Sequence, residues 1–308
     1  MTLLLGGVEI GRLLDVDEVL RDLRDGFCGQ SPVAPARVRA ELPGGNSATG
    51  LLAGTAAGIP AYTAKVNAKF PGVRPALRGL VCLHDLTDGS LLAVLDSAAV
   101  TSWRTGLAAA VVSAELAGPP GTVGVVGAGA QASRVVAGLR RLGWGEELVV
   151  HDLDPGRAAA FCPGARVVGS AREVAAAADL VVLATWSREP LLDLADVRAG
   201  SHLTSLGVDE PGKHELGAAL LSAATLVVDD VPQAFRGGAP GNAGLGAEAV
   251  DATAAEVLTG THPGRTGAAE ITAYTPTGMP WQDLVLAWSL YRSARERGVG
   301  AEFDFLHG

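Results

Sequence analysis

Residues 122–132 read TVGVVGAGAQA, an apolar run followed by a G-x-G-x-x-A turn. In such a turn Gly127 permits the tight bend from strand to helix, and Gly129 lets the backbone approach a pyrophosphate. The next helix begins near Ala130 and Gln131, and its first N–H groups are donors for an anion. The stretch therefore predicts a dinucleotide-binding turn made by these four residues. A glycine-rich turn without a nucleotide is the alternative.

The turn opens a region in which short apolar segments alternate with helical or loop segments. Strands are predicted at 122–126, 148–151, 165–168, 180–184, 202–206 and 226–228. Such alternation is typical of a parallel sheet covered on both faces. We therefore expect a Rossmann domain, a doubly wound parallel sheet, over residues 119–275. The Gly- and Pro-rich segment 231–246 is predicted to be a loop over the sheet edge.

Asp152 follows the second of these strands, 20 residues after Ala132. A carboxylate at this place binds the 2′-hydroxyl of a ribose and repels the 2′-phosphate of NADP. No arginine immediately follows the strand, so the sequence favours NAD as cofactor. Two alternatives stay open, because Asp154 could be the ribose partner and Arg157 could serve a phosphate. NADP is therefore not excluded.

The residues before this region have a different pattern. A helix with apolar residues at helical spacing is predicted at 16–27, followed by strands at 38–42, 61–66, 80–83 and 91–95. A further helix at 98–116 is stopped by the Gly118-Pro119-Pro120-Gly121 sequence. We expect residues 1–118 to form an α+β domain for substrate binding and dimerisation. Residues 276–308, with a helix at 281–297, are expected to return to it.

Composition excludes several classes of protein. Acidic residues outnumber basic ones by 33 to 24, which disfavours nucleic acid as a partner. We expect no membrane association, since no apolar stretch approaches the roughly 20 residues of a spanning helix. The three cysteines and six histidines have no metal-ligand spacing, so no metal site is predicted. The odd number of cysteines, which are widely separated, and the lack of a signal-peptide pattern favour the cytoplasm.

Lysine is scarce, with three residues against 21 arginines. Lys65 ends an apolar strand, where a desolvated ammonium can act as an acid or a base. A surface lysine at the end of a strand is an equal alternative. For Lys69 and Lys213 composition favours the solvated surface interpretation.

Two further charged residues stand in places where ligands bind. Arg104 interrupts an apolar helical face and could hold the carboxylate of an acid substrate, with a structural salt bridge as the alternative. Asp209 follows the strand 202–206, at the carboxyl edge where open α/β sheets bind ligands. In isolation, a turn aspartate is the more common interpretation of Asp209.

Together these residues resemble the ornithine cyclodeaminase and mu-crystallin family, which includes amino-acid dehydrogenases and ketimine reductases. The resemblance spans nearly the whole chain. It is carried by Pro35-Ala36-Arg37, Lys65 with Pro71, residues 104–108 (RTGLA), the turn 127–132, residues 184–187 (ATWS) and residues 207–216 (GVDEPGKHEL). It implies a Rossmann domain inserted into an α+β substrate-binding and dimerisation domain.

The resemblance also implies roles for single residues. Arg37, Lys65 and Arg104 would hold the substrate carboxylate, and Asp209 and Lys65 would manage protons at the amine or imine. Besides Asp152 and the turn, cofactor contacts would come from Thr105, Thr185 and Ser187. The chain departs from the family pattern at Lys69 and at residues 274–278 (YTPTG). The resemblance therefore does not define the pocket for the substrate side chain.

We therefore predict an NAD(P)-dependent oxidoreductase that acts on the Cα–N bond of a small amino acid or a cyclic imino acid. The first alternative is a cyclodeaminase that uses NAD catalytically and releases ammonia. The second is a non-catalytic protein that binds NAD(P) or a small ligand, like mu-crystallin. The resemblance implies a homodimer.

Overall fold

The computed structural model describes residues 1–29, 33–44, 46–70, 72–119 and 121–305, so Pro71 and Pro120 lie outside the described residues. The chain divides into unit 1, Met1–Thr105 with Met279–Gly308, and unit 2, Gly106–Gly278. The boundary at residue 105 falls inside helix α3 (Ser97–Leu116). The roles predicted for residues 1–118, 119–275 and 276–308 stay predictions.

Unit 1 is built on a mostly antiparallel sheet, which in the described part of the chain has seven strands in the order β15-β1-β6-β5-β4-β3-β2. The strands are β1 (Thr2–Leu5), β2 (Ala36–Leu42), β3 (Asn46–Gly54), β4 (Ala61–Lys69), β5 (Leu77–Asp85), β6 (Leu91–Asp96) and β15 (Ala301–Phe303). The strands predicted before residue 100 are confirmed with longer bounds, whereas β1, β3 and β15 are additional. The two ends of the chain meet in this sheet, because β1 pairs with β15.

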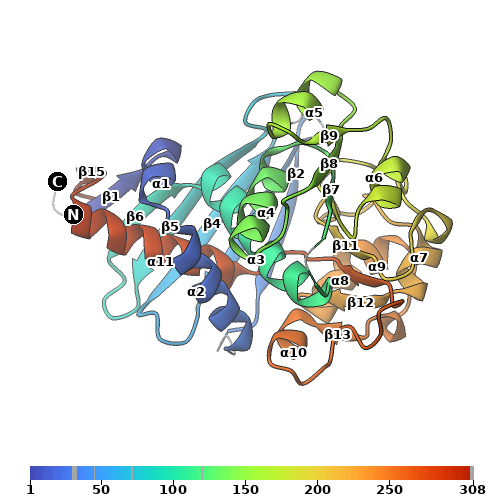
Figure 1. Cartoon of the computed structure of the whole chain (residues 1–308). Helices are drawn as coiled ribbons and strands as arrows, with labels where there is room; N and C mark the ends of the chain where they lie inside the picture. The colour runs from blue at the N-terminus through green and yellow to red at the C-terminus, as the bar shows by residue number, and fades with distance from the viewer. Residues whose placement is uncertain (30–32, 45, 71, 120, 306–308) are drawn as a thin grey trace. The chain divides into compact units, whose positions relative to one another are not determined.

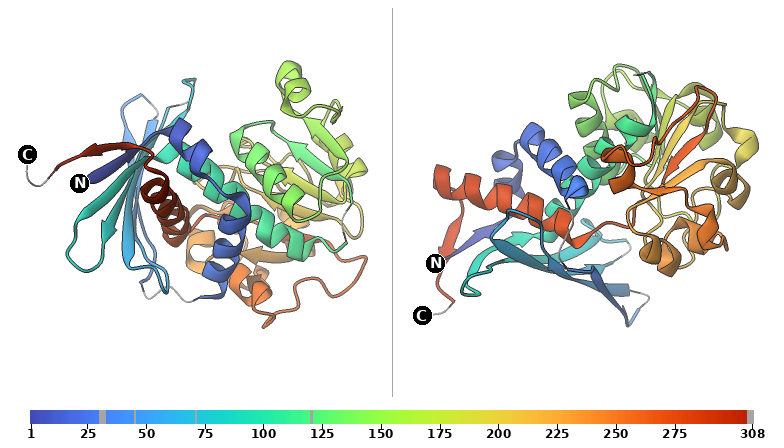
Figure 2. Two further views of the ribbon diagram at one scale, coloured as in Figure 1. Left: turned by 60° about the vertical axis from the view of Figure 1, so that its left-hand side comes forward. Right: turned by 90° about the horizontal axis from the view of Figure 1, so that it is seen from below.

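Helices cover one face of this sheet. They are α1 (Gly7–Leu13), α2 (Val16–Cys28) and α11 (Pro280–Arg297), which confirms the helices predicted at 16–27 and 281–297. Helix α11 lies along the sheet in Figures 1 and 2 and packs against β3, β4 and β5 on one side and against α2 on the other. Its side chains are therefore buried around the helix as far as Leu290, with the exception of Trp288, which is partly exposed.

The two faces of the sheet differ in exposure. The cross-strand row Leu51–Lys65–Val81–Leu95 is buried under the helices. The neighbouring positions Val66 and Leu80 point the other way, since successive residues of a strand alternate between faces, and they are 62% and 53% exposed. Lys65 therefore lies on the covered face.

Unit 2 is the predicted Rossmann fold, and the predicted fold class is confirmed. Among the described residues its sheet has eight strands, all paired in parallel, in the order β13-β12-β14-β11-β10-β7-β8-β9. The strands are β7 (Val123–Val126), β8 (Leu148–His151), β9 (Arg166–Val167), β10 (Leu180–Leu183), β11 (His202–Ser205), β12 (Thr225–Val228), β13 (Ala252–Thr253) and β14 (Thr272–Tyr274). The order runs outward in both directions from β7 and β10, so the topological switch point lies between these two strands.

The helices of unit 2 connect these strands. They are α4 (Ala130–Arg141), α5 (Pro155–Phe161), α6 (Ala171–Ala177), α7 (Ala218–Ala223), α8 (Val231–Gly237), α9 (Ala239–Asn242) and α10 (Ala254–Leu258). The loop predicted for 231–246 is wrong, because α8 and α9 occupy most of it. The Asp230 side chain caps α8 by accepting the N–H of Gln233 at 2.9 Å. The prolines of both helices lie in the first turn, where proline loses no helical hydrogen bond.

Among the described residues, no helix combines the length and the apolar character needed to cross a bilayer. The described part of the chain also contains no group of three or more histidine, cysteine or acidic side chains that is placed to hold a metal ion. The compartment stays a prediction.

Candidate active site

The glycine turn of unit 2 lies at the switch point of the parallel sheet. Gly127 has a φ of +91°, and a Cβ there would lie 2.7 Å from the carbonyl oxygen of Ala184. Only glycine fits this place, for both reasons. Gly129 is different, because its φ is −93° and a Cβ there would meet nothing within 4 Å. The backbone at Gly129, the N-cap of α4, thus borders open space large enough for an approaching group.

Asp152 lies beside this turn. Its Oδ2 accepts the N–H of Ala128 at 2.8 Å, and its Oδ1 accepts the N–H of Asp154 at 2.9 Å. Asp154 itself caps α5, with its Oδ1 accepting the N–H groups of Gly156 and Arg157. The Arg157 guanidinium lies 3.7 Å from Asp152 and 3.9 Å from Asp154, and it is 43% exposed. The carboxylate in contact with the turn is therefore that of Asp152.

Glu215 connects the carboxyl ends of β10 and β11, and it was not among the predicted site residues although it lies in the stretch 207–216. Its side chain is completely buried, and its Oε1 accepts the N–H of Thr185 at 2.6 Å and the Thr185 hydroxyl at 2.7 Å. Its Oε2 accepts the hydroxyl of Ser205 at 2.7 Å and the N–H of Gly207 at 2.9 Å. Burial raises the pKa of Glu215, and these hydrogen bonds act against that rise. Glu215 thus fixes Thr185 against the loop that leads to Asp209.

Asp209 pairs with a lysine that was interpreted from the sequence as a solvated surface residue. That interpretation of Lys213 is wrong, because its side chain is only 7% exposed and its Nζ lies 3.0 Å from Asp209 Oδ1. The same ammonium lies 4.6 Å from the ring centroid of Trp186, within the range of a cation–π contact. The two charged residues are four apart in a turn, so Asp209 is more than a solvated turn aspartate.

The turn between Asp209 and Lys213 is held by Asn242 of α9. Asn242 Nδ2 donates to the carbonyl oxygens of Glu210 at 2.8 Å and Lys213 at 3.0 Å, and its Oδ1 accepts the N–H of Gly212 at 3.3 Å. The segment mistaken for a loop therefore supplies the side chain that fixes this part of the candidate site.

Unit 1 contains a second cluster, centred on a carboxylate that the sequence analysis did not identify. Asp283, in the first turn of α11, is 1% exposed and lies between two cations. Its Oδ2 is 2.6 Å from Lys65 Nζ, and its Oδ1 accepts the Nε–H of Arg104 at 3.1 Å. Gln282 Oε1 accepts a second hydrogen bond from Arg104, from Nη1 at 2.8 Å. The salt bridge considered for Arg104 therefore exists, and Lys65 is a buried residue and not a surface one.

Arg37 lies in the same covered row of the sheet as Lys65. Its register partner is Leu51 on β3, and the partner of Leu51 on the other side is Lys65 on β4. Arg37 and Lys65 are thus two strands apart on one face, a separation of about 10 Å between backbones. The pKa of Lys65 is lowered to about 7, mainly by burial and also by the charges of Arg104 and Arg37, whereas Asp283 acts in the opposite direction.

Thr105 and Ser187 are the remaining predicted site residues. The Thr105 hydroxyl is buried and has no hydrogen-bond partner among the described residues, so it can take an outside one. The Ser187 hydroxyl donates to the carbonyl oxygen of Glu189 at 2.6 Å and thus closes a local turn. Lys65 belongs to unit 1 and Asp209 to unit 2, so their predicted convergence stays a prediction.

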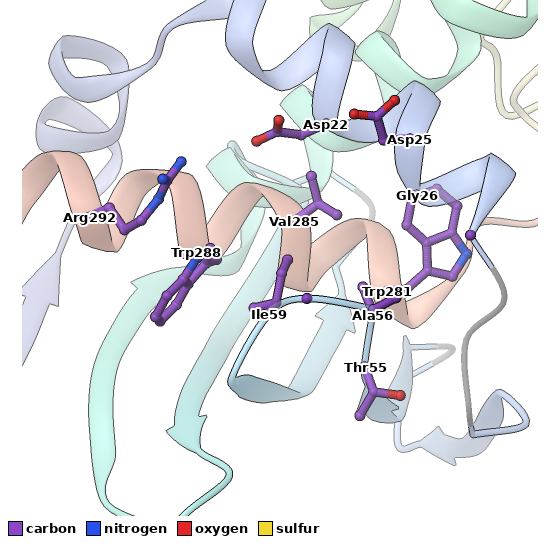
Figure 3. A pocket seen from close by; sticks show the side chains of 13 residues that line it. Asp22, Asp25, Gly26, Thr55, Ala56, Ile59, Trp281, Val285, Trp288 and Arg292 are labelled. Carbon is purple, nitrogen blue, oxygen red and sulfur yellow. The ribbon is translucent and has the colours of Figure 1, made fainter.

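A separate cavity of about 280 Å³ lies in unit 1 (Figure 3). Trp281, Val285 and Trp288 of α11 form one wall, and Asp22 and Asp25 of α2 lie opposite. Among the described residues that line it, none was predicted to bind substrate or cofactor. This cavity is therefore distinct from both clusters described above.

A sequence model of the ornithine cyclodeaminase/mu-crystallin family matches residues 42–298. The chain belongs to this family. The resemblance predicted from the sequence is therefore confirmed. Within the family, the chain is 32% identical to an alanine dehydrogenase of Archaeoglobus fulgidus, an alignment that covers 99% of this chain and 98% of that protein. It is 31% identical to an iminosuccinate reductase of Paracoccus denitrificans over 73% of each chain.

Solved structures of family members have the same fold. An archaeal alanine dehydrogenase dimer with bound NAD has a TM-score of 0.89 and 29% identity over 99% of both chains. The iminosuccinate reductase of Paracoccus denitrificans in complex with NAD⁺ has a TM-score of 0.87 and 25% identity, again over 99% of both. These relatives are enzymes, and they include oxidoreductases of amino and imino acids as well as an L-lysine cyclodeaminase of Streptomyces rapamycinicus.

Proposed function

We propose that this chain is an NAD-dependent oxidoreductase that acts on the Cα–N bond of a small amino acid or imino acid. The observation that carries the proposal is the buried cluster of unit 1, where Lys65 and Arg104 share the carboxylate of Asp283 and Arg37 lies in the same cross-strand row as Lys65. Two buried basic side chains on this one carboxylate leave an excess of positive charge, which an anionic ligand would relieve. A substrate carboxylate is the group that matches this excess.

The two arginines and the lysine have different tasks in the proposal. The Arg104 guanidinium uses Nε and Nη1 toward Asp283 and Gln282, and its remaining N–H donors suit a carboxylate. Arg37 supplies a second guanidinium from β2. Lys65, with a pKa of about 7, can exchange a proton near neutral pH. Asp209, held by Lys213, is the second proton-exchanging group that we assign to the substrate nitrogen.

The switch-point edge of unit 2 fits a dinucleotide. The open space at Gly129, the N-terminus of α4 and the Asp152 carboxylate beside the turn match the requirements of a pyrophosphate and a ribose. NAD would accept a hydride from the substrate Cα or deliver one to it. We favour NAD over NADP because Asp152 lies at the turn, and we assign further contacts to Thr105 and to the Thr185–Ser187 loop.

Two alanine substitutions test the catalytic roles. Lys65→Ala and Asp209→Ala are expected to abolish turnover while NADH still binds, as measured by NADH fluorescence. Unchanged turnover in either variant would reject the role of that residue.

A matched pair of glycine variants tests the nucleotide site. Gly129→Ala is expected to keep the melting temperature and to weaken NADH binding at least tenfold, because its Cβ would occupy the open space. Gly127→Ala is expected to lower the melting temperature, because its Cβ would collide with the Ala184 carbonyl. Unaltered NADH affinity in a folded Gly129→Ala protein would contradict the placement of the pyrophosphate.

Cyclodeamination is the second candidate, favoured by 31% identity to the L-lysine cyclodeaminase over 73% of this chain. The two reactions differ in net redox change. A dehydrogenase or reductase changes NADH absorbance in proportion to product, whereas a cyclodeaminase releases ammonia with no lasting change. A screen of amino acids, cyclic imines and keto acids with amines, with absorbance and ammonia measured in parallel, separates them.

We further propose that the exposed sheet face of unit 1 pairs with a second copy of the chain. Val38, Val66 and Leu80 lie in one cross-strand row, interrupted only by Gly50, and all three are more than half exposed. An apolar row of this kind on a sheet is typical of a protein interface. The archaeal alanine dehydrogenase is described as a dimer.

A further inference from the structure

Asp283 is the residue on which the cationic cluster of unit 1 depends. It reaches Lys65 with one oxygen and Arg104 with the other, at 2.6 and 3.1 Å, from a position that is 1% exposed. Its neighbour Gln282 takes a further N–H of Arg104 at 2.8 Å. One turn of α11 therefore sets the positions of two cations that come from β4 and α3.

The position of α11 itself is fixed by close packing. A Cβ on Gly54 of β3 would lie 2.4 Å from the carbonyl oxygen of Pro280, so strand and helix start are in direct contact. On the opposite side, the Trp281 ring packs on Gly26 and makes an edge contact with Phe27 of α2, with ring centroids 4.9 Å apart. Asp283 thus stands on a rigid support, as groups that position others require.

The charges around Lys65 show what the carboxylate does for it. The charged groups that face the Lys65 ammonium are Asp283 from α11, Arg104 from α3 and Arg37 from β2. The Thr101 hydroxyl of α3 also lies 3.5 Å from Nζ. Burial and both arginines disfavour the protonated lysine, and Asp283 is the group among these that favours it.

We propose that Asp283 is a positioning residue of the reaction, which holds Lys65 and Arg104 in place and keeps a proton on Lys65 for transfer at the substrate nitrogen. The inference rests on the proposed function and adds to it a residue that touches neither substrate nor cofactor in the proposal. Without the carboxylate, Lys65 loses its proton at lower pH, and Arg104 loses one of its two anchors.

The pH dependence of kcat/KM tests this inference, since it reports the protonation of the free enzyme. For the wild type we expect the plot of kcat/KM against pH to have a limb with a midpoint near pH 7, which reports the titration of Lys65. In Asp283→Asn we expect this midpoint to be lower by about one pH unit or more, because the carboxylate no longer favours the protonated lysine. We expect KM to be at least tenfold higher, because Arg104 is no longer held in place. Asp22→Asn removes a carboxylate of α2 that lines the cavity of Figure 3 and serves as the matched control, with an unchanged profile.

Asp283→Glu covers the case in which the asparagine variant does not fold. It keeps the negative charge but displaces it by one methylene group, so we expect the wild-type midpoint together with a raised KM. A folded Asp283→Asn protein with the wild-type midpoint and KM would overturn the inference, as would a glutamate variant with unchanged KM.

Lys65→Ala separates this inference from the proposed function. If Lys65→Ala retains turnover, the proposed role of Lys65 fails. If Lys65→Ala is inactive while Asp283→Asn behaves as wild type, the role of Lys65 stands and that of Asp283 fails.

Discussion

Replacement of Lys65 by methionine should change how the stability of unit 1 depends on pH. The pKa of Lys65 is about 7 in the folded protein and 10.5 for the ordinary side chain. Between these values the unfolded chain binds a proton that the folded chain has lost. Stability of the wild type therefore gains from rising pH in this window. Methionine is of similar length and cannot titrate, so the variant lacks this gain.

The size of the effect follows from the same two values. Their difference corresponds to roughly 5 kcal/mol across the whole window from pH 7 to 10.5. Between pH 7 and pH 9 the expected increase is about 2 kcal/mol, because the folded state is half protonated at the start of this interval. Below pH 6 both states carry the proton, so Lys65 contributes no pH dependence there.

Urea unfolding of wild type and Lys65→Met at pH 5, 6, 7, 8 and 9, followed by tryptophan fluorescence at one protein concentration, measures the effect. The useful quantity is the free energy of unfolding of the wild type minus that of the variant, because the titrating groups that do not interact with Lys65 cancel in it. This difference should be flat from pH 5 to 6 and then rise by about 2 kcal/mol between pH 7 and 9. A difference that stays constant to within about 0.5 kcal/mol over the whole range would refute the lowered pKa of Lys65.

Three further changes have expected outcomes. In Glu215→Gln the glutamine side chain cannot accept all four hydrogen bonds that Glu215 accepts, so a buried donor such as the N–H of Gly207 loses its partner. Thermal unfolding should then show a free energy of unfolding lower by about 1–3 kcal/mol. Asn242→Ala removes the side chain that holds the turn 210–213, and kcat should fall more than NADH affinity; equal losses of both would argue against a local effect on Asp209. Val66→Asp places a charge on the exposed apolar row of unit 1, and light scattering should then find a monomer, whereas we expect a dimer for the wild type; an intact dimer of the variant would exclude this face.

Elements with a strong local pattern could be predicted from the sequence. Helix α2 follows Asp15, whose side chain accepts the N–H groups of Asp17 and Glu18, and its apolar residues recur at helical spacing. Strand β3 gives no such signal, because Asn46–Gly54 is rich in glycine and alanine, which have low strand propensity. It forms because β2 and β4 hydrogen-bond to it on both sides.

The candidate site divides in the same way. The Gly127 turn is local, so its conformation follows from a short stretch of sequence. Asp283 is 179 residues away from Arg104, and an acidic residue in the first turn of a helix is common for reasons of the helix dipole alone. Only the packing of α11 shows its contacts. For Lys213, the spacing of four residues from Asp209 was a usable signal, which an interpretation from composition alone did not take into account.

The division of unit 1 between two distant parts of the chain has a consequence for synthesis. Ribosomes add about 5–20 residues per second, so all of Gly106–Gly278 is translated before Met279–Gly308 begins to emerge. During those seconds the first-made strands have no α11 to cover them, and the ammonium of Lys65 has no counter-ion. Unit 2 is therefore fully translated before unit 1 is, and the amino-terminal strands meet the helix that covers them, α11, only at the end of translation.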